Sequence, residues 1–245
     1  MNPSLAQVLE RPDIRRGDAF AVAPAPALAT GFPRLDAELP GGGWPRGALT
    51  ELLPEHSGIG ELGLLLPALA ALTAAGQTVV LIAPPHRAHA PAWAAAGIRL
   101  DCLRLVLPRR SRDARDALWA GVEALRCGGV AATLLWLDAP LRGHLPASSL
   151  RRLHVAAGEG GGGAFCFRPP RLAAEASPAP LRLQLQAAGG QLRVTILKRR
   201  GPPARQAILL DIARPAGFSQ GVSDAVACTA LPDASDIRQR SRVAA

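Results

Sequence analysis

The sequence predicts an α/β fold of three layers, in which helices cover both faces of a mostly parallel central sheet that ends in an antiparallel meander. Between Thr30 and Ile212, short segments that are apolar throughout alternate with helical stretches. This pattern is typical of parallel strands that are buried on both faces. After residue 180 the pattern changes to an alternation of apolar and polar residues, which indicates strands with one covered face.

The regular region defines a core domain over residues 30–212. Residues 1–29 precede it, and there we expect a short helix over SLAQVLER and a Pro/Ala-rich linker, VAPAPALA. Residues 213–245 are rich in Ser, Asp, Pro and Arg and have little periodicity, so we expect a disordered tail.

The parallel part of the sheet is predicted from apolar runs, and the helices from the stretches between them. The predicted strands are Leu49–Leu53, Thr78–Ala83, Leu103–Leu107, Ala132–Leu137 and Ala164–Phe167. The predicted helices are Glu61–Ala75, Ala90–Ala96, Arg112–Arg126 and Ser149–Ala157.

The meander is predicted from LRLQLQAAGGQLRVTILKRR. Its leucines at 181, 183 and 185 alternate with polar residues, and Gly189–Gly190 supplies a tight turn. A second strand follows at Gln191–Leu197 and a third at Gln206–Ile212.

Composition limits the class of protein. The chain has 245 residues and is 49% apolar, which is enough for one sizeable core. The run Leu62–Ala75 is broken by Pro67 and is too short to span a bilayer, and the first residues show no secretory signal. We therefore expect a cytoplasmic protein with no membrane partner.

The four cysteines are scattered, so no metal site is expected.

The formal net charge of +9 comes almost entirely from arginine, because Lys198 is the only lysine of the chain. A GC-rich genome would produce this bias through codon usage. The alternative is an arginine-rich surface for nucleic acid or an acidic partner. Composition alone favours codon usage.

A degenerate phosphate loop follows the first predicted core strand. A P-loop, G-x-x-x-x-G-K-[ST], cradles phosphates with backbone donors, a lysine and a hydroxyl. Here proline replaces the first glycine, Gly60 stands at the lysine position and Glu61 at the hydroxyl position. The whole window is Pro54, Glu55, His56, Ser57, Gly58, Ile59, Gly60 and Glu61.

A carboxylate at this place would repel a phosphate by several kcal/mol at an effective dielectric constant of about 20. We therefore expect no ATP hydrolysis and no bound cofactor, although backbone amides leave weak nucleotide binding open. Gly58 and Gly60 are expected to allow a tight turn, and Glu61 is expected to begin the following helix.

The segment before this loop, TGFPRLDAELPGGGWPRGALTELL, resembles the corresponding segment of RecA-family recombinases. The closer resemblance is to the ImuA family, RecA-like and SulA-related proteins of bacterial damage-induced mutagenesis cassettes. It rests on PGGGWPRGALTELL, GIGEL, LIAPP, AAGI and LKRRG and covers about residues 30–212. The resemblance implies a RecA-like, P-loop NTPase-type fold.

The resemblance also implies that catalytic positions are lost. Pro85 stands where RecA has the glutamate that activates water, and proline cannot act as a base. Asp138 matches the Walker B aspartate, but a strand-end or capping role is the favoured interpretation of this residue. We therefore expect a protein that is not an enzyme.

Candidate contact residues follow from the same resemblance. Lys198, Arg199 and Arg200 match the basic strand end that reaches the neighbouring RecA subunit, and a solvated hairpin end is the alternative. The RecA DNA-binding loops correspond to Ala139–Ser149, which contains Arg142, and to Arg168–Pro180, which contains Arg168 and Arg171. Arginines could give weak, salt-sensitive DNA binding. No aromatic residue interleaves with them, so base stacking is poorly supported.

What is known of the ImuA family implies three protein partners: RecA, the inactive Y-family polymerase homologue ImuB, and an error-prone C-family DNA polymerase. The expected function is that of a non-catalytic accessory protein of SOS-induced translesion DNA synthesis, with DNA as a further ligand. Two alternatives stay open: a degenerate ATPase that uses Lys198 as a relocated cation, and a SulA-type division inhibitor acting on FtsZ.

Overall fold

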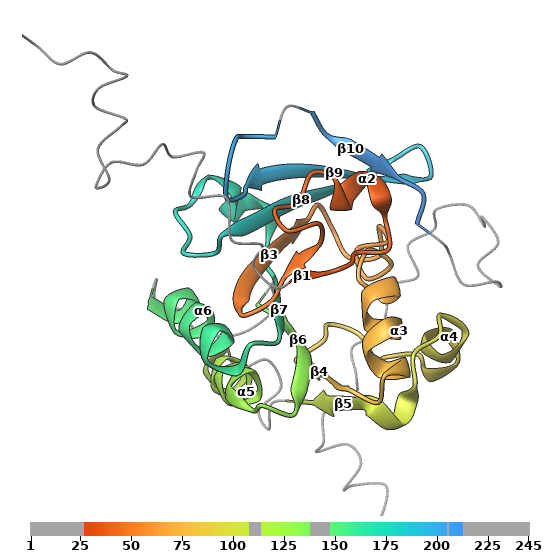
Figure 1. Cartoon of the computed structure of the whole chain (residues 1–245), viewed down its shortest axis with the longest axis vertical. Helices are drawn as coiled ribbons and strands as arrows, with labels where there is room; N and C mark the ends of the chain where they lie inside the picture. Colours follow the sequence, from red (N-terminus) through yellow and green to blue (C-terminus); the bar gives the residue numbers. More distant parts are fainter. Residues whose placement is uncertain (1–26, 108–113, 138–147, 205, 213–245) are drawn as a thin grey trace, which may run out of the picture. The chain divides into compact units, whose positions relative to one another are not determined.

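A mixed sheet of eight strands forms the centre of the protein in this computed structural model (Figure 1). The structure describes residues 27–107, 114–137, 148–204 and 206–212. The strand order is β10-β9-β8-β3-β7-β6-β4-β5, and neighbouring strands from β8 to β5 are parallel. The strands are β3 (Ala48–Pro54), β4 (Thr78–Ile82), β5 (Leu103–Val106), β6 (Val130–Trp136), β7 (Gly163–Phe167), β8 (Leu181–Ala188), β9 (Gln191–Lys198) and β10 (Ile208–Leu210).

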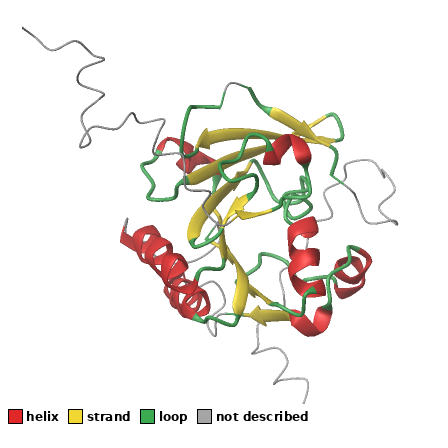
Figure 2. Cartoon of the chain, in the orientation of Figure 1, coloured by secondary structure: helices red, strands yellow, loops and turns green. Residues whose placement is uncertain are grey.

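Helices cover both faces of the parallel part (Figures 1 and 2). On one face lie α3 (Leu66–Ala74) and α4 (Ala90–Ala95), and on the other lie α5 (Ala114–Arg126) and α6 (Ser148–Gly160). Successive strand residues serve opposite faces. Leu52 and Leu81 pack in the core on the α3 side, whereas Leu49 and Ile82 pack in the core on the α5–α6 side. The predicted α/β class and covered parallel sheet are confirmed.

The predicted strands are all present, with ends shifted by a few residues. The antiparallel meander is confirmed as well, because β9 pairs antiparallel with both β8 and β10. One helix boundary was wrong. α3 begins at Leu66, and residues 61–65 form turns instead of the first helical turn predicted from Glu61.

Smaller elements complete the described part of the chain. β1 (Ala27–Leu28) pairs antiparallel with β2 (Trp44–Pro45), and the short α2 (Pro33–Asp36) lies between them in the sequence. Two 3₁₀ turns are η2 (Leu100–Cys102) and η3 (Pro170–Ala174). The predicted helix and linker before residue 27 and the predicted tail of residues 213–245 lie outside the described residues. Among the helices that are described, none combines the length and apolarity needed to cross a membrane.

Candidate functional site

Strand β3 positions the candidate site. All seven of its residues are buried between β7 and β8. Its carboxyl end leads into residues 55–65, called loop 55–65 below, which connect it to α3. In open α/β sheets, ligands bind outside the carboxyl ends of the parallel strands. Loop 55–65 is therefore where a nucleotide phosphate would be expected.

The side chain of Glu61 occupies this loop. The Gly58 N–H donates to both oxygens of the Glu61 carboxylate, at 3.0 and 3.1 Å, and the Ser57 hydroxyl donates to Oε1 at 3.3 Å. Glu61 is only 6% exposed, although Ser57 and Gly58 lie at the surface. The loop therefore donates hydrogen bonds to an anion that belongs to its own chain.

The loop backbone is built for this contact. Gly58 and Gly60 have φ angles of 90° and 100°, which side-chain-bearing residues rarely adopt. The predicted tight turn at these glycines is confirmed. The Glu55 N–H donates to the Leu185 carbonyl of β8 at 2.9 Å, and this bond fixes the start of the loop. Glu61 folds back toward Gly58, which explains why the helix begins only at Leu66.

This geometry sets what the loop can do chemically. A phosphate would have to displace the Glu61 carboxylate from Gly58 and Ser57 and would then meet its charge. Pro54 offers no N–H donor. Within the residues that the structure describes, no group of three or more His, Cys, Asp or Glu side chains could hold a metal ion.

Pro85 and Asp138 of the predicted nucleotide site, and Arg142 of the predicted first DNA-binding loop, have different outcomes. Pro85 follows the end of β4 and is half-buried. Near it, Ala83 has a φ of 52°, so the chain turns sharply as it leaves the strand. Asp138 and Arg142 lie outside the described residues.

A buried ion-pair network on β3 was not predicted. Glu51 is 0% exposed and forms a 3.0 Å salt bridge with Arg182 of β8. Arg168, which follows β7, approaches the same carboxylate at 3.5 Å, and the Ser177 hydroxyl hydrogen-bonds its other oxygen. We call Glu51, Arg168, Ser177 and Arg182 the Glu51 network. An acidic residue within an apolar strand was the sequence signal, because a buried charge requires a partner.

The Glu51 network fastens residues 168–180, for which the sequence resemblance predicts a DNA-binding loop. Arg182 donates to the carbonyls of Leu172, Ala173 and Glu175 at 2.9 to 3.0 Å. The Arg168 side chain is only 12% exposed and also pairs with Glu175 at 3.6 Å. Arg168 is therefore held within the protein, whereas Arg171 in η3 is exposed.

The basic strand end of β9 lies at the opposite, amino end of β3. Lys198 pairs with Arg182 in the β8–β9 register, and its ammonium donates to the Ser177 carbonyl at 2.7 Å. Arg199 donates to the Glu38 carboxylate at 2.7 Å and to Pro202 O at 2.7 Å, so this side chain is a structural clamp. Arg200 is exposed.

A hollow of about 90 Å³ opens beside these residues, and we call it the amino-edge hollow. It is lined by Pro40, Pro45, Arg46, Gly47, Ala48, Pro180, Leu181, Arg199 and Arg200. His154 of α6 lies nearby and accepts the Leu49 N–H at Nδ1, at 3.3 Å. Burial first, and then the charges of Arg200 and Lys198, lower the pKa of His154.

No family model matches the chain, and no curated protein sequence matches it either.

Proposed function

We propose that this protein is a non-catalytic, RecA-like accessory protein of SOS-induced, error-prone translesion DNA synthesis in the cytoplasm. It acts by binding RecA, ImuB and an error-prone C-family DNA polymerase, with DNA as a further ligand. The resemblance to the ImuA family motivates the partners. The antiparallel pair β9–β10 beside a parallel sheet supports the RecA-like form of the α/β fold.

The observation that carries the proposal is the Glu61 contact. A nucleotide-driven protein needs the donors of its phosphate loop for the nucleotide. Here the Gly58 N–H and the Ser57 hydroxyl donate to Glu61 within the loop. A protein that keeps the strand–loop–helix geometry but fills the loop with its own carboxylate is best suited to act by binding.

Strand β5 offers a surface for a protein partner. It is the last strand of the sheet beyond β4 and has no neighbour on its other side among the described residues. Leu100, Leu105 and Leu107 are exposed at or beside it. An edge strand with exposed apolar side chains can accept a strand from another protein.

The geometry does not favour the ATPase alternative. Lys198 pairs with Arg182 near the beginning of β8, whereas loop 55–65 meets β8 at Leu185. Arg182 and Leu185 are three residues apart on β8, which corresponds to about 10 Å at roughly 3.3 Å per residue. Lys198 also donates to the Ser177 carbonyl, away from the loop.

The proposal is tested by measuring binding of the full chain to RecA filaments and to ImuB, with and without ATP. We expect binding that does not depend on nucleotide bound to this protein, and no heat of ATP–Mg²⁺ binding to the isolated chain in calorimetry. Failure to bind both partners would refute the accessory role. Measurable ATP turnover would refute the non-catalytic role.

A charge variant probes the amino-edge hollow in the same assay. Lys198→Ala with Arg200→Ala removes two exposed charges, and Arg199 is left intact because it clamps Glu38. Arg193→Ala removes one exposed charge elsewhere on β9 and serves as the control. Weaker partner binding in the double variant alone would place a contact at this hollow.

A further inference from the structure

The amino-edge hollow is small enough to select its ligand by size. It lies where strands β3 and β8 begin and strand β9 ends. Its volume of about 90 Å³ is well below that of sites for small molecules and cofactors, which span roughly 300–1,000 Å³. A whole nucleotide is therefore too large for the hollow, whereas a single side chain of another protein fits.

Most of the lining of the amino-edge hollow is apolar. Three prolines, Pro40, Pro45 and Pro180, line it together with Ala48 and Leu181. An apolar side chain that enters the hollow is removed from water by these groups, which is favourable. None of the lining residues is aromatic, so a nucleobase would find no ring on which to stack.

Two arginines of the hollow are available to an anion. The side chains of Arg46 and Arg200 have no hydrogen bond or ion pair within the described residues, and no carboxylate lines the hollow. The Glu38 carboxylate is already paired with Arg199. Burial lowers the pKa of His154 most, and the charges of Arg200 and Lys198 lower it further, so their positive potential reaches α6. The hollow therefore combines an apolar lining with uncompensated positive charge.

Contacts within the chain hold the hollow in shape. Arg199 donates to the Glu38 carboxylate and to the Pro202 carbonyl, each at 2.7 Å. The Gly47 N–H donates to the Gly162 carbonyl at 2.9 Å. The rings of the three prolines fix their own φ angles. A site that is already formed loses little conformational freedom when a ligand binds.

We propose that the amino-edge hollow docks an acidic peptide segment of a partner protein. One apolar side chain of the partner enters the hollow, and carboxylates on either side of it in the partner's sequence pair with Arg46 and Arg200. An apolar anchor in a pocket with charged groups at the rim is a common arrangement at protein interfaces. This docking site rests on the proposed function, because it specifies the partner chemistry that such an accessory protein would recognise.

The test measures binding of the full chain to fluorescein-labelled 12-residue peptides by fluorescence anisotropy. Each peptide carries a central Leu, Ile or Phe between Asp and Glu residues, in a Gly/Ser background. Replacement of the central residue by Ser should weaken binding about 10-fold or more. Replacement of the acidic residues by Asn and Gln should weaken binding several-fold and remove its salt dependence.

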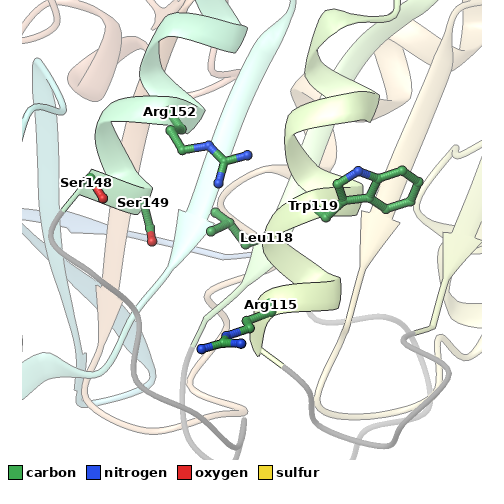
Figure 3. A pocket seen from close by; sticks show the side chains of 6 residues that line it. All are labelled: Arg115, Leu118, Trp119, Ser148, Ser149 and Arg152. Carbon is green, nitrogen blue, oxygen red and sulfur yellow. The ribbon is translucent and has the colours of Figure 1, made fainter.

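Charge variants locate the binding. Arg200→Glu reverses an exposed charge and should weaken binding of the acidic peptides about 5- to 20-fold, and Arg46→Ala should weaken it about 2- to 5-fold. Peptides with Lys in place of Asp and Glu should bind Arg200→Glu better than the wild type. The matched control is Arg152→Glu, which should leave peptide binding unchanged. Figure 3 shows this exposed arginine of α6 directed into a different hollow, of about 250 Å³, between α5 and α6.

The docking site would be overturned if none of the acidic peptides bound the wild type, or if Arg152→Glu weakened binding as much as Arg200→Glu. It would also be overturned if 20-nucleotide oligo-dT bound in place of the peptides and lost affinity in Arg200→Glu, since the hollow would then contact nucleic acid. The accessory function is judged separately by capture of RecA and ImuB. Capture of these proteins without peptide binding would refute the docking site alone, and peptide binding without capture of either would refute the accessory function.

Discussion

Two buried carboxylates ten residues apart, Glu51 within β3 and Glu61 in loop 55–65, are stabilised in different ways. Glu51 is paired with two arginines and a hydroxyl, in the interior of the sheet. Glu61 has no salt-bridge partner among the described residues and is held by a backbone N–H and a hydroxyl. The comparison separates a charge that is paired inside the sheet from a charge that is held by the loop at the carboxyl end of β3.

Removal of the Glu51 carboxylate should have the largest effect. Glu51→Ala leaves Arg182 buried without its counter-charge, which typically costs about 3–5 kcal/mol. We expect a loss of this size in the free energy of unfolding, measured by urea denaturation. The segment 168–180 should become more sensitive to proteases, because Arg182 fastens it. Unchanged stability would show that the network is not a fold determinant.

Removal of the Glu61 carboxylate should cost less. Hydrogen bonds to a charged group contribute about 1.5–3 kcal/mol, and the surface N–H of Gly58 can bond to water instead. We expect Glu61→Ala to lower the free energy of unfolding by about 2 kcal/mol, with the protein still folded. Glu61→Gln retains an acceptor and should lose less. Equal stabilities for the alanine variant and the wild type would contradict the loop contact.

His154 at the other end of β3 should give a smaller, pH-dependent effect. Its pKa is lowered in the folded protein, so the unfolded chain takes up a proton at higher pH than the folded chain. Its contribution is present above the ordinary histidine value of about 6.5 and is lost as the pH falls through that value toward the folded pKa. In His154→Gln, the loss of stability between pH 7 and pH 5 should be smaller, as measured by urea denaturation at each pH. A steeper loss would contradict the assignment.

Removal of an exposed salt bridge should change the free energy of unfolding least, and it serves as a reference for the effects of the buried carboxylates. Arg126 of α5 and Glu159 of α6 are 2.7 Å apart, with about half of each side chain exposed. Glu159→Ala should change the free energy of unfolding by less than about 1 kcal/mol. A loss comparable to that of Glu51→Ala would mean that burial does not decide the ranking.

The sequence predicted the sheet well, because the central parallel strands are rich in apolar residues that pack into two cores, and the strands of the meander alternate apolar and polar residues. It also predicted the end of β3, where the apolar run stops, and the turn at Gly58 and Gly60, because glycines allow tight turns. It misplaced the start of α3, since the position of Glu61 depends on a contact back to Gly58 that competes with the helix.

Charged residues were harder to place. The alternation of apolar and polar residues around Arg182 suggested that its side chain faces outward. Instead, the segment 168–180 covers the Arg182 side chain, which forms a salt bridge with Glu51. Arg168 was predicted as a nucleic-acid contact, yet it turns toward the same carboxylate. Long-range ion pairing with Glu51 decides both positions.

The Glu61 contact has a consequence for how the accessory protein would respond to the cell. A recombinase whose loop binds ATP changes its assembly as the ratio of ATP to ADP changes. On the proposed function, a loop that holds its own Glu61 carboxylate would not respond to that ratio. On the proposed function, its occupancy on partners would follow only how much of it has been synthesised, so that transcription after DNA damage, and not the energy charge of the cell, would set the dose of mutagenesis.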